Sequence, residues 1–262
     1  DLINNPSRKI IAGNANSMSG SDGVGLWQPA GIFLMPDKTV YIADKANNRV
    51  QKWTNGASFG TTVAGGHGYG NINLNNEDST LTEPNDVTVV NNTLYISSRN
   101  KIQKWVEGSY EGVTLALASD FNSSVGFSSI AYHNGYVYSA IPDKHVIMRW
   151  NVDGSNPAGE MVAGVYGEAG DDQLHLNYPN SVYFNNSNGG ELYYADRGNY
   201  RVQMLLLSTL SSPYIPPSSQ TVAGGNGYGN LLSQLQDIND IYVDANRTVY
   251  ISDKGWNTLS RI

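Results

Sequence analysis

A segment of thirteen residues recurs five times along the chain, and this repetition constrains the fold more than any other feature. Each copy follows a short apolar stretch, and a third element, typified by Thr-Val-Ala-Gly-Gly, separates the copies. Two of these third elements, 62–71 and 221–230, match at nine of ten positions. Such a period indicates stacked units that are each too small to bury their own apolar face. The copies, the second shorter by two residues, are 41–53, 95–105, 138–150, 193–205 and 250–262.

Each repeating unit contains four runs of β-strand composition, which we call strands a, b, c and d. Pairs such as Asn91-Asn92 and Asn134-Gly135 separate strand a from strand b, and these residues accept the positive φ angles of tight hairpins. Four antiparallel strands per unit are typical of propeller blades. Small residues in strands b and d allow neighbouring sheets to pack closely, and the tryptophans of strand c supply large apolar surfaces. We therefore expect an all-β protein, a β-propeller of five four-stranded blades, with residues 1–262 as a single domain.

The best-preserved copy begins at Val40 and reads Val-Tyr-Ile-Ala-Asp-x-x-Asn-x-Arg-Val-Gln-Lys-Trp. Together with Val-Ala-Gly-Gly-x-Gly-x-Gly, this pattern resembles the NHL repeat family, and the resemblance covers essentially the whole chain. The third copy is degenerate, with Ile141 and Val146 where Asp and Arg are expected. The resemblance implies a propeller that serves as an interaction platform and commonly has six blades. The copies in this chain favour five NHL-like blades over six.

The two ends of the chain have complementary patterns. Residues 8–13 have the pattern of strand d, whereas the last residues complete a strand c. We expect this N-terminal strand to supply the fourth strand of the last blade, which closes the ring and hides two sheet edges. Two alternatives stay open: the strand inserts into a neighbouring molecule and builds a polymer by strand exchange, or a sixth blade is missing.

Composition excludes several classes of function. The net charge of −7 and the pI near 5.0 leave no basic stripe that could bind nucleic acid. No apolar run approaches the roughly 18 residues that a membrane span requires. The absence of cysteine excludes disulfides, thiol catalysis and zinc sites built from cysteine.

No motif in the chain has the pattern of a catalytic centre. Nucleophilic serine motifs are absent, and the four histidines lack the spacing of metal ligands. Two sets of an acid, an amide and an arginine recur with the repeat, which favours a structural role for them. We therefore expect no enzyme activity, no metal and no cofactor. The two sets are Asp44, Asn47 and Arg49, and Asp196, Asn199 and Arg201.

A secreted metal-dependent lyase or hydrolase is the alternative to a non-catalytic role. The NHL resemblance implies a lyase class that holds zinc with several histidines near the channel. His67 and His175 lie in the same kind of loop, between strands d and a, and this keeps the alternative open.

Two groups of residues indicate ligand binding. At the start of strand a, Asn85-Asp86 and Asn239-Asp240 occupy equivalent positions, where they could hold a cation or a ligand hydroxyl; ordered water is the simpler interpretation. Aromatic residues recur in the loops between strands d and a, where they can stack on sugars, anchor a protein partner or merely pack on glycine. These aromatic residues are Tyr69, Tyr166, Tyr228 and Trp27.

Four Asn-x-Ser/Thr sequons are candidates for glycosylation. Asn91, Asn185 and Asn246 lie in turns between strands a and b, on one face of the expected propeller, and Asn122 lies in a loop on the other face. We expect a secreted, extracellular glycoprotein that acts as a non-catalytic binding or assembly module. Its partner is a protein or a second copy of the chain, and a carbohydrate-binding module is a further alternative.

Overall fold

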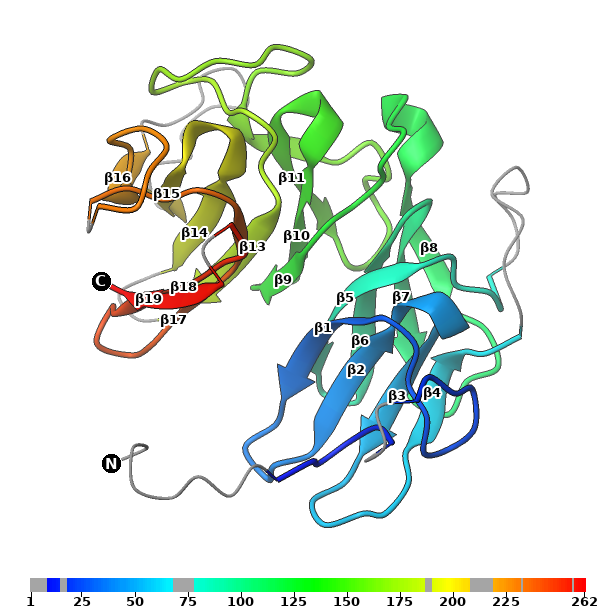
Figure 1. Cartoon of the computed structure of the whole chain (residues 1–262). Helices are drawn as coiled ribbons and strands as arrows, with labels where there is room; N and C mark the ends of the chain where they lie inside the picture. The colour runs from blue at the N-terminus through cyan, green and yellow to red at the C-terminus, as the bar shows by residue number, and fades with distance from the viewer. Residues whose placement is uncertain are drawn as a thin grey trace.

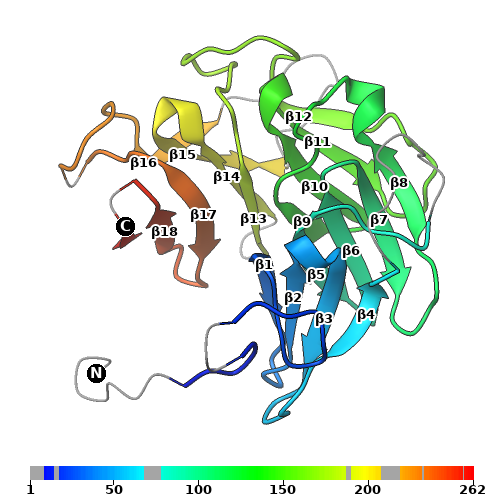
Figure 2. The ribbon, with the colours of Figure 1, turned by 45° about the vertical axis from the view of Figure 1, so that its right-hand side comes forward.

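The computed structural model describes residues 9–14, 18–67, 78–186, 190–207, 219–231, 233–255 and 257–262. In this part of the chain the regular structure is β-strand with a few single-turn 3-10 helices, and the strands form five antiparallel sheets. Figures 1 and 2 show the sheets arranged as blades around a common centre. The predicted all-β fold, a β-propeller of five blades, is confirmed. None of the helices described has the length and apolar character needed to cross a membrane.

The blades follow one another along the chain, and each runs from its inner to its outer strand. Blade 1 consists of β1 (Pro29–Leu34), β2 (Val40–Asp44), β3 (Arg49–Trp53) and β4 (Thr61–Gly65). Blade 2 consists of β5 (Pro84–Val90), β6 (Thr93–Ser98), β7 (Lys101–Val106) and β8 (Val113–Leu117). Blade 3 consists of β9 (Ile130–His133), β10 (Tyr136–Ile141), β11 (Val146–Asn151) and β12 (Glu160–Gly164). Blade 4 consists of β13 (Ser181–Asn185), β14 (Glu191–Asp196), β15 (Arg201–Leu206) and β16 (Gln220–Gly224), and blade 5 of β17 (Ile238–Val243), β18 (Val249–Asp253) and β19 (Thr258–Arg261).

The hairpins form where the sequence places residues that tolerate positive φ. Asn91 and Asn92 have φ values of 49° and 59°, and Asn134 and Gly135 have values of 46° and 80°. Two consecutive residues with positive φ are the requirement of the type I′ turn, whose twist matches that of the strands it joins. Strands b and c are joined by single turns of 3-10 helix in blades 1, 3 and 4, which are η1 (Lys45–Asn47), η3 (Pro142–Lys144) and η5 (Arg197–Asn199).

The core lies between blades. Each of four apolar clusters combines residues of one blade with residues of the next. We call the surface of a blade that faces the following blade its back, and the surface that faces the preceding blade its front. Contacts between blades therefore supply the burial that a single sheet lacks. Trp105 and Trp150 are almost fully buried in two of these clusters. The residue that precedes strand d packs on each indole: a Cβ at Gly112 would lie 2.3 Å from Trp105 Nε1, and one at Gly159 would lie 2.5 Å from Trp150 Nε1.

The structure differs from the prediction at the ends of the array. Among the described residues the fifth sheet has three strands, and residues 9–14 form no strand. Ala12 instead packs with Leu26 against the front of blade 1, so this segment lies against the first blade and not beside β19. The expected closure of the last blade by residues 8–13 is therefore not formed by the part of this segment that the structure describes, residues 9–13. Inner strands contact each other in the order β1, β5, β9, β13 and β17, and Figure 2 shows blade 5 standing apart from blade 1.

Candidate binding face

One end of the blades carries the b–c turns and the loops that lead into the inner strands, and we call it the loop face. Backbone hydrogen bonds tie each turn to the loop of the same blade. Ala46 N donates to Trp27 O at 3.0 Å in blade 1, and Gly198 N donates to Asn177 O at 2.7 Å in blade 4. Figure 1 shows the short helical turns at this end of successive blades. The repeat therefore brings together segments that are about 20 residues apart in the chain.

A buried ion pair fixes the loop of blade 1. The carboxylate of Asp44, which is fully buried, accepts hydrogen bonds from Arg49 Nε at 2.7 Å and from Trp27 N at 2.7 Å. The other guanidinium nitrogens of Arg49 donate to three carbonyls of residues 21–25 at 2.7 to 3.0 Å. Because the loop has no regular structure, these carbonyls depend on the arginine for partners.

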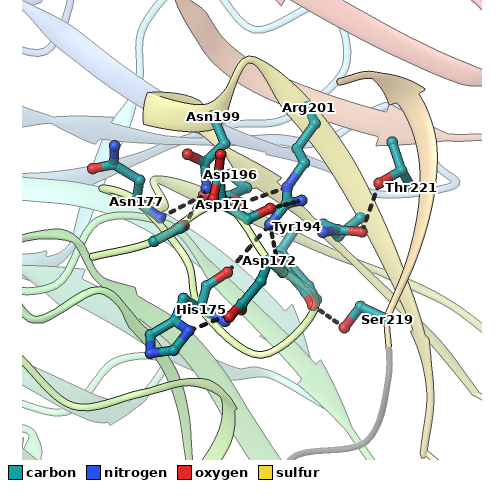
Figure 3. Close-up of polar contacts among 12 residues, drawn as sticks. Asp171, Asp172, His175, Asn177, Tyr194, Asp196, Asn199, Arg201, Ser219 and Thr221 are labelled. Atoms are coloured by element: carbon teal, nitrogen blue, oxygen red, sulfur yellow. Dashed lines mark hydrogen bonds and ion pairs between the residues drawn. The ribbon is translucent and has the colours of Figure 1, made fainter. Parts of the chain in front are cut away.

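The same arrangement recurs in blade 4, and Figure 3 shows it. Asp196 accepts from Asn177 N at 2.7 Å and from Arg201 Nε at 2.8 Å, while Arg201 donates to the carbonyls of Asp171, Asp172 and His175. Burial raises the pKa of Asp196, and the three donors around it oppose that effect. The structural role predicted for the two acid–amide–arginine sets is confirmed by these contacts.

Acidic side chains mark the starts of two inner strands. Asp86 accepts from Ser129 Oγ at 2.9 Å and from Ile130 N at 3.0 Å, which joins blade 2 to blade 3. Asp240 accepts from Ser181 Oγ at 2.6 Å, which joins blade 5 to blade 4. The serines occupy the positions of blades 3 and 4 that are equivalent to the two aspartates. The four residues therefore connect neighbouring blades at the inner strands.

Burial raises the pKa of Asp86 to about 7, and repulsion from Asp240 adds to that rise. The pKa of Asp240 is also raised by the protein around it, although water reaches its exposed side chain. Solvent screening weakens the effect at Asp240, so we assign the stronger perturbation to Asp86.

The asparagines beside these acids also cross blade boundaries. Asn85 accepts from Lys45 Nζ of blade 1 at 2.9 Å and donates to Phe127 O at 2.8 Å. The side chain of Asn239 is exposed, and its carbonyl accepts from Asn180 Nδ2 at 3.1 Å. The Asn85 side chain therefore has its polar partners within the protein and holds blades together, whereas Asn239 contributes its backbone carbonyl to such a contact.

The aromatic candidates lie in separate loops. Trp27, Tyr166 and Tyr228 are 50 %, 47 % and 57 % exposed, and they come from the loops before blades 1, 4 and 5. Tyr166 donates its hydroxyl to Phe121 O, and Tyr228 packs edge-on against Tyr200 with 5.4 Å between ring centroids. Both tyrosines are therefore anchored by one contact while much of each residue is open to solvent. Tyr69 lies outside the described residues.

A series of basic residues on the loop face was not among the predicted site residues. A Lys or Arg follows strand b in four blades, at Lys45, Arg99, Arg197 and Lys254. Arg197 pairs with Asp237 of the next blade and lies over the ring of Tyr178, 6.0 Å from its centroid. The signal was present in the sequence, because these positions are equivalent within the thirteen-residue repeat.

The histidines lie in four different settings. His175 Nδ1 lies 2.8 Å from Asp172 Oδ1, and this contact raises the pKa of His175, while backbone N–H donors lower the pKa of Asp172 to about 2. His145 accepts from Tyr178 N, His133 stacks on Phe184, and His67 packs against Tyr110. In the described part of the chain, no three acidic or histidine side chains are placed to hold one metal ion.

The sequons differ in accessibility. Asn91, Asn122 and Asn246 are exposed at turns. Asn185 is 6 % exposed, and its side-chain amide donates to the buried Glu191 at 3.4 Å. A glycan on Asn185 would have to displace this contact, so the three exposed asparagines are the better candidates.

Comparison with known proteins shows that the fold of this chain is similar to that of solved structures. No protein-family model and no curated protein sequence matches the chain. An auxiliary nutrient binding protein of Bacteroides thetaiotaomicron superposes with a TM-score of 0.64 at 17 % identity, over 90 % of this chain and 59 % of the other. The chain therefore spans about three fifths of the length of that protein.

Two further solved structures show the same fold. The crystal structure of a nidogen/laminin complex matches with a TM-score of 0.63 at 16 % identity, over 91 % of this chain and 77 % of the other. Virginiamycin B lyase of Staphylococcus aureus matches with a TM-score of 0.55 at 13 % identity, over 89 % and 66 %. These neighbours and the five blades bear out the propeller fold that the NHL-like repeats predicted, and at such identities they establish the fold alone.

Proposed function

We propose that the protein is a non-catalytic, extracellular binding module whose loop face contacts a protein partner. The observation that carries this proposal is the way the loop face is held. Buried arginine–aspartate pairs fix the loops at residues 18–28 and 165–178, and the same loops present Trp27 and Tyr166 to solvent. Rigid loops with exposed aromatic side chains lose little conformational entropy on binding.

The comparisons support a binding role without naming a ligand. A neighbouring propeller is described as an auxiliary nutrient binding protein, and another was solved in a nidogen/laminin complex. Secretion is part of the proposal, and it accords with the three exposed sequons. Self-assembly by exchange of the segment at residues 8–13 is the scaffold form of the same proposal.

The test compares capture of secreted proteins by the wild-type chain and by loop-face variants. Trp27→Ala and Tyr228→Ala should each reduce the amount of a captured protein by about tenfold if these rings are central to the interface. Phe59→Ala is the matched control, because Phe59 is 65 % exposed but lies in the c–d hairpin of blade 1. If all three variants capture as much protein as the wild-type chain does, the contact surface does not include Trp27 or Tyr228.

Carbohydrate binding is the second candidate, and the glycines beside the tyrosines favour it. Tyr166 and Tyr228 each neighbour a glycine with positive φ, Gly167 at 78° and Gly227 at 82°. Glycine adds no side chain beside the ring, which favours an open face for stacking on a sugar. Binding on a glycan array that is lost in Tyr228→Ala and kept in Phe59→Ala would support this candidate over a protein partner.

A further inference from the structure

The neighbouring loops that lead into blades 3 and 4 bring a glycosylation sequon beside an exposed aromatic ring. The loop into blade 3 contains the helical turn η2 (Ala118–Phe121), and Asn122 caps its C-terminal end with a φ of 49°. The loop into blade 4 contains Tyr166, whose hydroxyl donates to the carbonyl of Phe121. Because Phe121 O belongs to the peptide unit that joins Phe121 to Asn122, the hydroxyl edge of the ring lies beside the backbone of the sequon.

One helical turn, η3 of blade 3, holds both loops in place. The carboxylate of Asp143 accepts from Ser123 Oγ at 2.6 Å and from Ser124 N at 2.9 Å. The carbonyl of the next residue, Lys144, accepts from Gly167 N at 2.9 Å. The sequon and the ring are therefore fixed relative to each other by two adjacent residues of η3.

The side chain of Asn122 is accessible to a sugar. Asn122 is exposed, and within the described residues its side-chain amide makes no hydrogen bond. Asn185 differs, because its amide donates to a buried carboxylate. The exposed sequons at Asn91 and Asn246 lie in turns between strands a and b, at the end of the blades opposite the loop face. Asn122 is therefore the exposed sequon that would place a glycan on the loop face.

Tyr166 presents a surface on which a sugar can stack. The residue is 47 % exposed, although its hydroxyl is held by Phe121 O. Gly167, which follows it, adds no side chain beside the ring, and an aromatic ring offers a broad apolar face for such a contact. A sugar tethered at Asn122 has an effective concentration of the order of millimolar near the ring, so it would occupy the ring ahead of a dilute free glycan.

We propose that Asn122 carries an N-linked glycan whose first sugar packs on the ring of Tyr166, so that occupancy of the sequon determines whether this ring is available on the loop face. The inference rests on secretion, which is part of the proposed function. In the transfer, Asn122 Nδ2 loses a proton and bonds to C1 of the sugar. The bond from C1 to a lipid-linked diphosphate breaks, and the diphosphate leaves with the electron pair. An occupied sequon leaves Trp27 and Tyr228 exposed, and an empty one adds Tyr166 to them.

The test uses the full chain secreted from a eukaryotic host. Peptide mapping before and after treatment with a glycoamidase, which converts an occupied asparagine to aspartate, should show a glycan at Asn122. Nitration of Tyr166 by tetranitromethane, followed by mass spectrometry, should be at least about threefold slower in the occupied chain than in Asn122→Gln. Tyr228 is the internal reference, because it is 57 % exposed in another loop and its nitration should not change.

Three controls identify the source of the protection. Asn91→Gln is the matched control, because Asn91 also has a φ of 49°, so both variants place glutamine at a left-handed position; nitration of Tyr166 should stay as in wild type. Ser124→Ala removes the same sequon and keeps Asn122, and it should accelerate nitration as Asn122→Gln does. Trimming the glycan to its first sugar with an endoglycosidase should keep the protection, because the first sugar makes the contact.

A secreted chain with Asn122 unoccupied overturns the proposal, and so does equal nitration of Tyr166 in the occupied chain and in Asn122→Gln. Protection that is lost on trimming also overturns it, because the outer sugars would then be the shield. Partner binding is tested separately, since the effects of Trp27→Ala and Tyr228→Ala on capture can be measured in the Asn122→Gln chain. If those variants capture normally while Tyr166 is protected in the occupied chain, the binding role is wrong and the glycan contact stands.

Discussion

Removal of the Asp196 carboxylate is the sharpest test of how the loop face is held. Asp196 is fully buried and accepts three hydrogen bonds, from Asn177 N, Asn199 Nδ2 and Arg201 Nε. Asp196→Ala leaves the guanidinium of Arg201, a residue only 9 % exposed, without its anion. Breaking one partner of a buried pair costs about 3–5 kcal/mol, a large part of the roughly 5–15 kcal/mol that stabilises a typical domain.

The burial that makes this loss expensive also limits the net stability of the intact pair. Burial raises the pKa of Asp196, so much of the attraction to Arg201 offsets the cost of removing the carboxylate from water. We therefore expect Asp196→Asn, which keeps the shape and an acceptor, to cost less than Asp196→Ala. The assay is urea unfolding followed by tryptophan fluorescence, with hydrogen exchange of residues 171–178 as a local readout.

The matched control is an exposed pair of the same chemistry. Arg149 Nη2 lies 2.6 Å from Glu160 Oε2 in blade 3, and the Glu160 side chain is 41 % exposed. Glu160→Ala should cost about 0–1 kcal/mol, because solvent screens exposed pairs. If Asp196→Ala costs no more than Glu160→Ala, or leaves exchange in residues 171–178 unchanged, the clamp does not hold the loop.

Three further predictions concern Asp86, Gly112 and Tyr228. The pKa of Asp86 is raised from 3.8 to about 7 in the folded protein, so the folded state binds more protons than the unfolded state between these values. This group therefore adds stability at acidic pH that is lost as the pH rises from about 4 through 7, and Asp86→Asn should flatten the dependence of the unfolding midpoint on pH between pH 4 and pH 7. Gly112→Ala should destabilise by about 1–3 kcal/mol, because the added Cβ would lie 2.3 Å from Trp105 Nε1; an unchanged midpoint in a denaturant titration would show that the indole can shift. Tyr228→Ala should change stability by no more than about 0.5 kcal/mol, since the ring is largely exposed, and a cooperative melt at the wild-type temperature would check this.

The positions of the strands could be predicted from the sequence because the repeat is local. The expected start of strand a at Asn85-Asp86 lies within β5, and the expected turn pairs Asn91-Asn92 and Asn134-Gly135 lie between β5 and β6 and between β9 and β10. Hairpin residues such as Asn91 determine where one strand ends and the next begins. That residues 1–262 form a single domain stays a prediction.

The arrangement of the candidate site was less accessible. The tyrosines recur in the sequence at equivalent loops, but equivalent loops belong to different blades, so Tyr166 and Tyr228 point from separate places on the rim. Asp86 was recognised as an inner-strand residue, yet its partners on Ser129 and Ile130 come from the next blade. A contact between residues more than 40 positions apart has no signature in a local pattern.

By itself, the sequence determined the five blades, because period, turn residues and apolar alternation are properties of short segments and agree in every copy. The tertiary structure alone decided how the array ends. Residues 9–14 have the pattern of a strand, but a strand forms only where another strand is beside it to pair with. Ala12 makes its apolar contacts with blade 1, whereas β19 belongs to blade 5, which stands apart from blade 1. Which surface a segment joins depends on the angles between packed blades, and those angles are set by side-chain packing throughout the array.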